Sequence, residues 1–196
     1  MRRMPGTPLS SVLLAAILII LIVLAGCTGT APARTTAAQT PVPENPAIGS
    51  FWKETRLPDL QGRGNISISG FAGKTVIVPV VSVSCPTCIV QLVRQLAEID
   101  RLARENPDHI VVVSFDIDPD TGPGFIATYG NSQTSTGYAV RSLDNMTLQI
   151  FRRFGPFAVD TQTIPVILVC PDGHDLLLPA GLKTAESLNM TIVREC

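Results

Sequence analysis

The sequence predicts an α/β domain built around a strand–helix–strand unit. Residues 75–83 (TVIVPVVSV) and 109–115 (HIVVVSF) are apolar and rich in β-branched side chains, as in strands that are covered on both faces. Between them, apolar residues recur at intervals of three and four from Ile89 to Ala103, which is the period of an amphipathic helix. A strand, a helix and a parallel strand in this order form a βαβ unit. A chain of 196 residues, 45% of them hydrophobic, can bury one ordinary core, so we expect one folded domain.

The other elements follow from local signals. Pro79 removes one hydrogen-bond donor from the first strand, which predicts a bulge or a strand in two parts. Pro86 suits the first turn of the helix, where its missing N–H costs nothing, and Asn106-Pro107 would end that helix. After the βαβ unit we expect a short helix at residues 147–154 and a last helix at residues 185–194. Between them, the turn sequence CPDG predicts a hairpin of two strands at residues 164–169 and 175–178.

The first 27 residues predict an export signal that is not part of the fold. Arg2 and Arg3 precede an unbroken apolar run at 12–25, which is shorter than the roughly 20 residues of a membrane-spanning helix and matches the ~7–15 residues of a signal's apolar region. Residues 28–50 are mainly Thr, Ala and Pro, which predicts a disordered tether. The folded domain is therefore expected to cover residues 51–196.

The end of this leader, Leu24-Ala25-Gly26-Cys27, resembles the lipobox of prokaryotic lipoproteins, in which the signal is cleaved before the cysteine and its thiol is lipidated. The resemblance implies an extracytoplasmic domain held on the cell membrane through Cys27; an uncleaved anchor and plain secretion are the alternatives. Two acyl chains suffice for stable membrane attachment. With 15 Lys+Arg against 16 Asp+Glu, the chain has no basic excess that would favour a nucleic-acid partner.

Five cysteines are a further constraint on an exported chain. If Cys27 is lipidated, two pairs are the simplest state outside the cytoplasm, where thiols tend to be oxidised. Cys85 and Cys88 are natural partners in the sequence Cys85-Pro86-Thr87-Cys88, called the CPTC motif below. Cys170 and Cys196 are then left as a possible structural disulfide, with free thiols as the alternative.

The order of the apolar strand, the CPTC motif, the long helix, the second strand, Thr163-Ile164-Pro165 and the PDG hairpin resembles the thioredoxin superfamily. It is most similar to the branch of peroxiredoxins and membrane-anchored thiol–disulfide oxidoreductases. The resemblance implies a central mixed β-sheet flanked by helices, with an insert between the second strand and the following helix. It also implies a cis-proline at Pro165, whose neighbour Ile164 would leave its backbone free to pair with a substrate segment.

The CPTC motif has the residues that disulfide exchange needs. A thiolate is the attacking species, and Cys85 would stand at the N-terminus of the helix, where unpaired N–H groups and the helix dipole favour negative charge. Cys88, one turn later, could resolve a mixed disulfide. We therefore expect Cys85, Cys88 and Pro165 to be catalytic, with protein thiols and disulfides of the cell envelope as partners and no cofactor beyond the redox-active disulfide. The residues expected to contact the substrate are Pro86, Thr87, Thr163 and Ile164.

Two departures from the thioredoxin pattern leave the redox direction open. Thioredoxins carry a tryptophan directly before the first cysteine and a buried acid six residues before it, and this chain has Ser84 and Pro79 there. No internal base for Cys88 is therefore evident. The Pro86-Thr87 dipeptide also differs from the Gly-Pro of thioredoxin, and this dipeptide tunes the redox potential.

Other functions have weaker support from the sequence. Zinc normally requires four ligands, and no second cysteine pair accompanies the motif, while His109 and His174 are the only histidines. Copper chaperones of this fold use Cys-x-x-x-Cys and a distant histidine; here one spacer residue is missing, although two thiolates could hold Cu(I). A peroxidase would fit Ser82 but requires a proline at position 78, which is valine. A plain structural disulfide is also an alternative for the CPTC motif.

The acidic residues of FDIDPDTG raise the question of a calcium site. Asp116, Asp118 and Asp120 alternate as in an EF-hand loop, but the glycine and glutamate that such a loop requires at its sixth and twelfth positions are Thr121 and Ala127. We therefore interpret this segment as the end of a strand and a loop, and we expect no metal.

Overall fold

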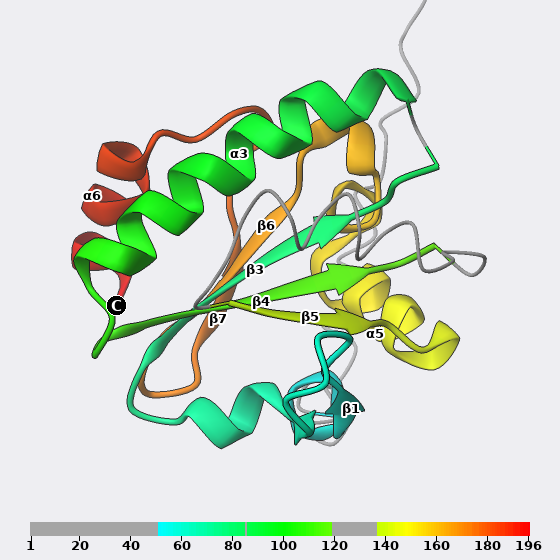
Figure 1. Ribbon diagram of the computed structural model, residues 1–196, viewed down its shortest axis with the longest axis horizontal. Helices are drawn as coiled ribbons and strands as arrows, with labels where there is room; N and C mark the ends of the chain where they lie inside the picture. The colour runs from blue at the N-terminus through cyan, green and yellow to red at the C-terminus, as the bar shows by residue number, and fades with distance from the viewer. Residues whose placement is uncertain (1–50, 85, 119–136) are drawn as a thin grey trace, which may run out of the picture. The chain divides into compact units, whose positions relative to one another are not determined.

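The computed structural model describes residues 51–84, 86–118 and 137–196, of which residues 86 and 87 are described by their backbone alone (Figure 1). The predictions for the signal, the tether, Cys27, Cys85 and Asp120 concern positions outside these residues. None of the helices in the described part has the length and apolar character required to cross a membrane.

The five-stranded sheet is mixed, as expected. Its order is β5-β4-β3-β6-β7, with parallel pairing from β3 through β4 to β5 and antiparallel pairing of β6 and β7. The 20-residue helix α3 connects β3 to β4 and completes the predicted βαβ unit. The strands are β3 (Thr75–Val81), β4 (Ile110–Asp116), β5 (Tyr138–Arg141), β6 (Val166–Val169) and β7 (Asp175–Leu177), and the helix α3 is Pro86–Glu105.

The remaining predicted elements occur in the predicted order, with shifted ends and some additional short elements. Helix α5 begins three residues before its predicted start, and strand β5, which was not predicted, lies in the insert after β4. Only four residues form β5, too few for a periodic signal. These and the smaller elements are β1 (Leu57–Pro58), β2 (Asn65–Ile66), α5 (Asp144–Phe154), α6 (Ala185–Glu195) and the 3-10 turns η1 (Ile68–Phe71), η2 (Pro156–Ala158) and η3 (Thr161–Thr163).

Apolar side chains cover both faces of the sheet, so the domain has three layers (Figure 1). All seven residues of β3 are buried, and their side chains alternate between the faces. On one face, Ile77 packs with residues of α3 and α6, such as Ile99 and Leu188. On the other face, Val76, Val78 and Val80 pack with α5 and with the segment that contains Trp52. The long apolar runs in the sequence therefore reflect burial on both sides.

Strand β3 accommodates Pro79 without the predicted bulge or break. The register to β4 is the same before and after Pro79, as the pairs Thr75↔Ile110 and Val81↔Asp116 show, although the ladder omits residues 78 and 79. Toward β6, the amide of Val80 donates to the carbonyl of Pro165 at 3.0 Å, so pairing resumes directly after the proline. One missing donor thus removes a hydrogen bond but does not shift the register.

The second predicted cysteine pair is confirmed. Cys170, at the end of β6, forms a disulfide with Cys196, directly after α6, with a Cα–Cα distance of 5.1 Å. This bond joins the last helix to the sheet, at the edge from which β3 begins, because Val169 pairs with Val76.

Candidate active site

The CPTC motif lies where β3 ends and α3 begins. Cys88 is in the first turn of α3, is half-buried and is disulfide-bonded. Because Cys170 and Cys196 are bonded to each other, the partner of Cys88 lies outside the described residues. The pairing of Cys88 with Cys85 therefore remains a prediction from the sequence.

The local electrostatics at the start of α3 favour a negative charge. The helix has 20 residues and no acidic residue in its first turn, so the positive end of its dipole and its first N–H groups are not offset from within the helix. A sulfur at this position is expected to ionise more readily than in a free peptide.

Asp118 binds the three residues that lead into the motif. Its Oδ1 accepts hydrogen bonds from the hydroxyls of Ser82 (2.7 Å) and Ser84 (2.9 Å). Its Oδ2 accepts from the amides of Val83 (2.7 Å) and Ser84 (3.0 Å). Burial raises the pKa of Asp118, but the hydrogen bonds from the serines and the two amides outweigh burial and lower it. The carboxylate is thus held ionised beside the entrance to the motif.

The sequence analysis did not identify this role of Asp118. It lies two residues after β4, and because parallel strands β3 and β4 end at the same edge of the sheet, it reaches the residues that follow β3. The pairing Val81↔Asp116 shows this adjacency. A carboxylate after one strand and two serines after its parallel neighbour were the available signal.

The prediction of a cis-proline at Pro165 was wrong. No peptide bond among the described residues is cis, and the Ile164–Pro165 bond is trans. The chain instead reverses at Ile164, which has a left-handed backbone conformation (φ 53°, ψ 62°) at the end of η3. This turn directs the chain into β6 with a trans bond.

The backbone of Ile164 is also not free, contrary to the expectation. Its amide donates to the carbonyl of Thr161 (3.3 Å) and its carbonyl accepts from the Nζ of Lys183 (2.8 Å). The carbonyl of Thr163 accepts from the amide of Gly181 (2.9 Å). Pairing of a substrate segment with these groups would first have to displace contacts within the domain.

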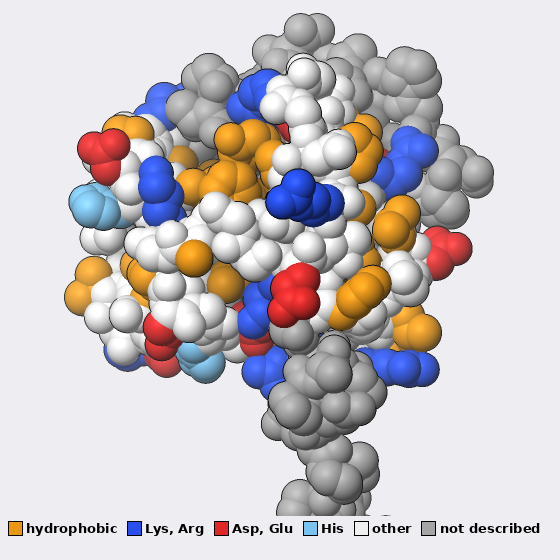
Figure 2. Space-filling model, turned by 90° about the horizontal axis from the view of Figure 1, so that it is seen from below, with side chains coloured by type: hydrophobic (Ala, Val, Ile, Leu, Met, Phe, Trp, Pro, Cys, Tyr) orange, Lys and Arg blue, Asp and Glu red, His pale blue; other side chains and the backbone are white. Residues whose placement is uncertain are grey.

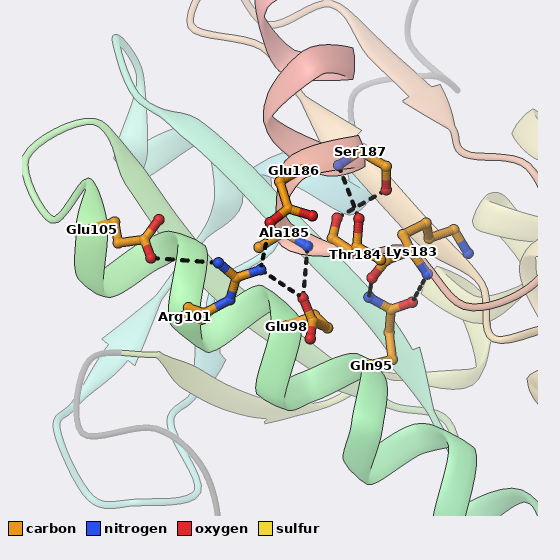
Figure 3. A network of polar contacts seen from close by, with 9 residues as sticks. All are labelled: Gln95, Glu98, Arg101, Glu105, Lys183, Thr184, Ala185, Glu186 and Ser187. Atoms are coloured by element: carbon orange, nitrogen blue, oxygen red, sulfur yellow. Dashed lines mark hydrogen bonds and ion pairs between the residues drawn. The ribbon is translucent and has the colours of Figure 1, made fainter.

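Lys183 is the second residue near the site that sequence reasoning missed. It is buried, and its Nζ donates to the carbonyls of Ile164 (2.8 Å) and Gly181 (2.6 Å). Its backbone is bonded to the side chain of Gln95 through two hydrogen bonds, of 2.7 and 3.1 Å, which connect α3 to this segment (Figure 3). Desolvation by burial lowers the pKa of Lys183 from 10.5 to about 8. A single lysine in the segment Gly181-Leu182-Lys183 carries no sequence signal for such burial.

The two histidines lie at the opposite end of the sheet from Cys88. The carbonyl of His109 accepts from the amide of Thr75, the first residue of β3, and His174 lies in the turn between β6 and β7. Strand β3 has seven residues and spans roughly 20 Å between these ends. Neither histidine can therefore join Cys88 in a common metal site. No group of three or more metal-binding side chains occurs within residues 51–84, 86–118 and 137–196.

A cleft of about 290 Å³ opens at this same far end of the sheet. Figure 2 shows the face seen from below, where hydrophobic side chains lie in a hollow next to basic side chains. Its lining includes the apolar residues Ile68, Phe71 and Val169 and the basic residues Lys53 and Lys74. Of the predicted catalytic residues that the structure describes, Cys88 and Pro165, neither lines this cleft.

Comparisons with known proteins agree with the fold. The Redoxin family matches residues 38–163, a range that contains the CPTC motif, whereas no curated protein matches the chain. Among solved structures, DsbF of Mycobacterium tuberculosis is 16% identical with a TM-score of 0.56, covering 73% of this chain and 96% of that chain. A SCO1/SenC family lipoprotein from Bacillus anthracis is 18% identical with a TM-score of 0.56, covering 71% and 91%. Copper-bound ScoI of Arabidopsis thaliana is 16% identical with a TM-score of 0.51, covering 71% and 94%.

Proposed function

Since the chain belongs to the Redoxin family and is an oxidoreductase of thioredoxin-like fold, we propose that it is an extracytoplasmic, membrane-tethered enzyme that exchanges disulfides with proteins through its CPTC motif. The observation that carries the proposal is the position of Cys88, disulfide-bonded in the first turn of a long helix that starts at the carboxyl edge of a parallel strand pair. A disulfide at a helix N-terminus, which stabilises a thiolate, supports this proposal.

The exchange proceeds in two balanced steps. In the reducing direction, the Cys85 thiolate attacks a partner disulfide, a mixed disulfide forms, and one partner sulfur leaves as a thiolate. The Cys88 thiolate then attacks the Cys85 sulfur, the CPTC disulfide closes, and the second partner sulfur leaves. Two electrons pass from the CPTC dithiol to the partner, and the protons of the two cysteines pass to the partner thiolates or to water. An upstream protein dithiol would restore the reduced motif by the same steps.

Exposed apolar side chains around the motif support a protein partner. Val90 follows Cys88 by two residues on α3, and its side chain is exposed. Phe157 and Leu182 are also exposed and border the segment around Thr163, since the carbonyl of Phe157 accepts from the Thr163 hydroxyl and Leu182 follows Gly181. Such side chains offer contact area to an apolar segment of a partner.

Membrane tethering through Cys27 is part of the proposal and has its own test. A Cys27→Ser variant cannot be lipidated, so it should leave the membrane fraction of the host envelope, whereas the wild type should remain there. A Cys170→Ser variant is the matched control and should stay with the membrane. Equal membrane association of the wild type and the Cys27→Ser variant would contradict lipid anchoring.

The experiment that tests the activity is trapping of mixed disulfides. A Cys88→Ser variant lacks the resolving thiol, so partners should remain attached to Cys85 as adducts that a reductant releases on a gel. The matched control is the double variant Cys85→Ser/Cys88→Ser, which should form no adduct while keeping the Cys170–Cys196 bond.

Two alternative functions predict different outcomes. A copper chaperone would bind Cu(I) tightly in its dithiol form and form no adducts; the distance of both histidines from Cys88 argues against this function. A peroxidase would consume hydrogen peroxide with a thiol reductant, and the Cys85→Ser variant would abolish that consumption. Absence of adducts with the Cys88→Ser variant at every redox condition would refute the oxidoreductase proposal.

A further inference from the structure

Asp118 is the charged group most directly connected to the CPTC motif. Its carboxylate accepts four hydrogen bonds from residues 82–84, and Ser84 is covalently joined to Cys85. The Ser84 amide lies 3.0 Å from Oδ2, and Ser84 is the residue directly before the motif, so the carboxylate lies about one residue's length from the start of the motif. No other carboxylate among the described residues binds the segment that enters the motif.

The hydrogen bonds also determine where two backbone donors point. The amides of Val83 and Ser84 are directed at Asp118, so neither is available to stabilise a thiolate in the residue that follows. The segment is thereby held in one conformation, and a negative charge is held close to it.

Other charged groups near Asp118 belong to the ends of β4 and β5. Asp116 is fully buried, and its Oδ1 accepts from the Asp118 amide at 3.0 Å. Asp116 is paired in register with Arg141 of β5, which places a cation opposite that second acid. The first turn of α3 contributes no acidic residue. Within residues 51–84, 86–118 and 137–196, Asp118 is the carboxylate that is hydrogen-bonded to the entrance of the motif.

We propose that Asp118 is a positioning residue for the CPTC motif and that its charge lowers the reduction potential of the Cys85–Cys88 pair. This inference rests on the proposed function, because it requires the motif to cycle between disulfide and dithiol. A nearby negative charge destabilises the Cys85 thiolate, which exists only in the reduced state, and leaves the neutral disulfide unaffected. The motif is thereby biased toward donating electrons to partner disulfides, against the opposite influence of the α3 dipole.

The expected magnitude follows from Coulomb's law. At a separation of about 10 Å and an effective dielectric constant of about 20, one charge shifts the ionisation of a second group roughly tenfold. Removing the charge should therefore move the equilibrium of the motif roughly tenfold toward the dithiol, which for two electrons corresponds to about 30 mV.

The test is the equilibrium of the full chain with glutathione, in which the CPTC dithiol and oxidised glutathione give the CPTC disulfide and two reduced glutathiones. Asp118→Asn should shift this equilibrium roughly tenfold toward the dithiol and lower the pKa of Cys85, read from the pH dependence of its alkylation. Asp118→Glu keeps the charge and should stay within about threefold of the wild type. Asp172→Asn removes a carboxylate at the far end of the sheet and should match the wild type.

Several outcomes would overturn the inference. An Asp118→Asn variant with the equilibrium and alkylation profile of the wild type would refute it, as would a shift toward the disulfide. An Asp118→Glu variant that shifts as far as Asp118→Asn would show that geometry, and not charge, sets the potential. Should Asp118→Asn fail to fold, Asp118→Ser removes the same charge and is judged by the same criteria. A wild-type motif that does not exchange with glutathione at all would refute the proposed function, and the inference with it.

Discussion

The buried ammonium of Lys183 predicts a specific pH dependence of stability. Burial lowers its pKa from 10.5 to about 8 in the folded protein. Between these two pH values the unfolded chain binds more protons than the folded protein, so the free energy of unfolding rises with pH in this interval. Below about pH 8 both states are protonated and the cost of the buried charge is constant. Above about pH 10.5 both states are neutral and that cost is absent.

The magnitude follows from the same two values. At about 1.4 kcal/mol per pH unit, the difference between 10.5 and about 8 corresponds to about 3 kcal/mol. The ammonium donates to the carbonyls of Ile164 and Gly181, which stabilise its charged form, so we expect a gain of about 1 to 3 kcal/mol between pH 8 and 10.5.

The assay is urea unfolding at pH 7.5, 9 and 10.5, followed by the fluorescence of Trp52, the single tryptophan of the chain, which is fully buried. Other groups titrate in this range, so the measured quantity is the difference in unfolding free energy between the wild type and a Lys183→Met variant. That difference should grow by about 1 to 3 kcal/mol in favour of the wild type as the pH rises. Lys74→Met, at a less buried lysine, is the control and should follow the wild type. A difference that stays constant to within about 0.5 kcal/mol would refute this account of the buried charge.

Three further predictions concern the rest of the fold. The Cys170→Ala/Cys196→Ala variant opens a loop of 26 residues and should lose about 3 kcal/mol of unfolding free energy in urea; a loss below about 1 kcal/mol would show that the last helix holds to the sheet without the bond. Ile167→Ala truncates a fully buried side chain in the core around Trp52 and should cost about 2 to 5 kcal/mol in the same assay, whereas an unchanged midpoint would contradict this packing. Burial raises the pKa of Asp59, but hydrogen bonds from Arg63 and the Ala139 amide outweigh burial and lower that pKa. The contribution of Asp59 to the free energy of unfolding is therefore complete above its unfolded pKa of 3.8 and is lost as the pH falls below about 4. Acid titration of an Asp59→Asn variant by circular dichroism should show a shallower loss of stability there, and an identical acid transition would exclude the contribution.

Much of the architecture could be predicted because the signals were local. The apolar run at 75–83 predicted β3, and the three- and four-residue period at 89–103 predicted α3. The CPDG turn predicted the hairpin of β6 and β7. Each of these depends on the side chains of one continuous segment, so a single sequence is sufficient to recognise it. Strand β5 was missed because it is short and its stability comes from pairing with β4.

In the candidate site, too, the features of one continuous segment could be predicted, and those that depend on tertiary contacts could not. The chain sequence by itself placed the two cysteines at the junction of a strand and a helix, and it left Cys170 and Cys196 as the second pair. Only the tertiary structure brought Asp118 to Ser82–Ser84 and Lys183 to Ile164, across 34 and 19 positions of the chain. The Ile164–Pro165 bond is trans, so the cis-proline that the family resemblance implied was wrong. Chemistry that one segment contains can be recognised from its residues, whereas a group that acts from another strand becomes evident only when the sheet has set which strand ends are neighbours.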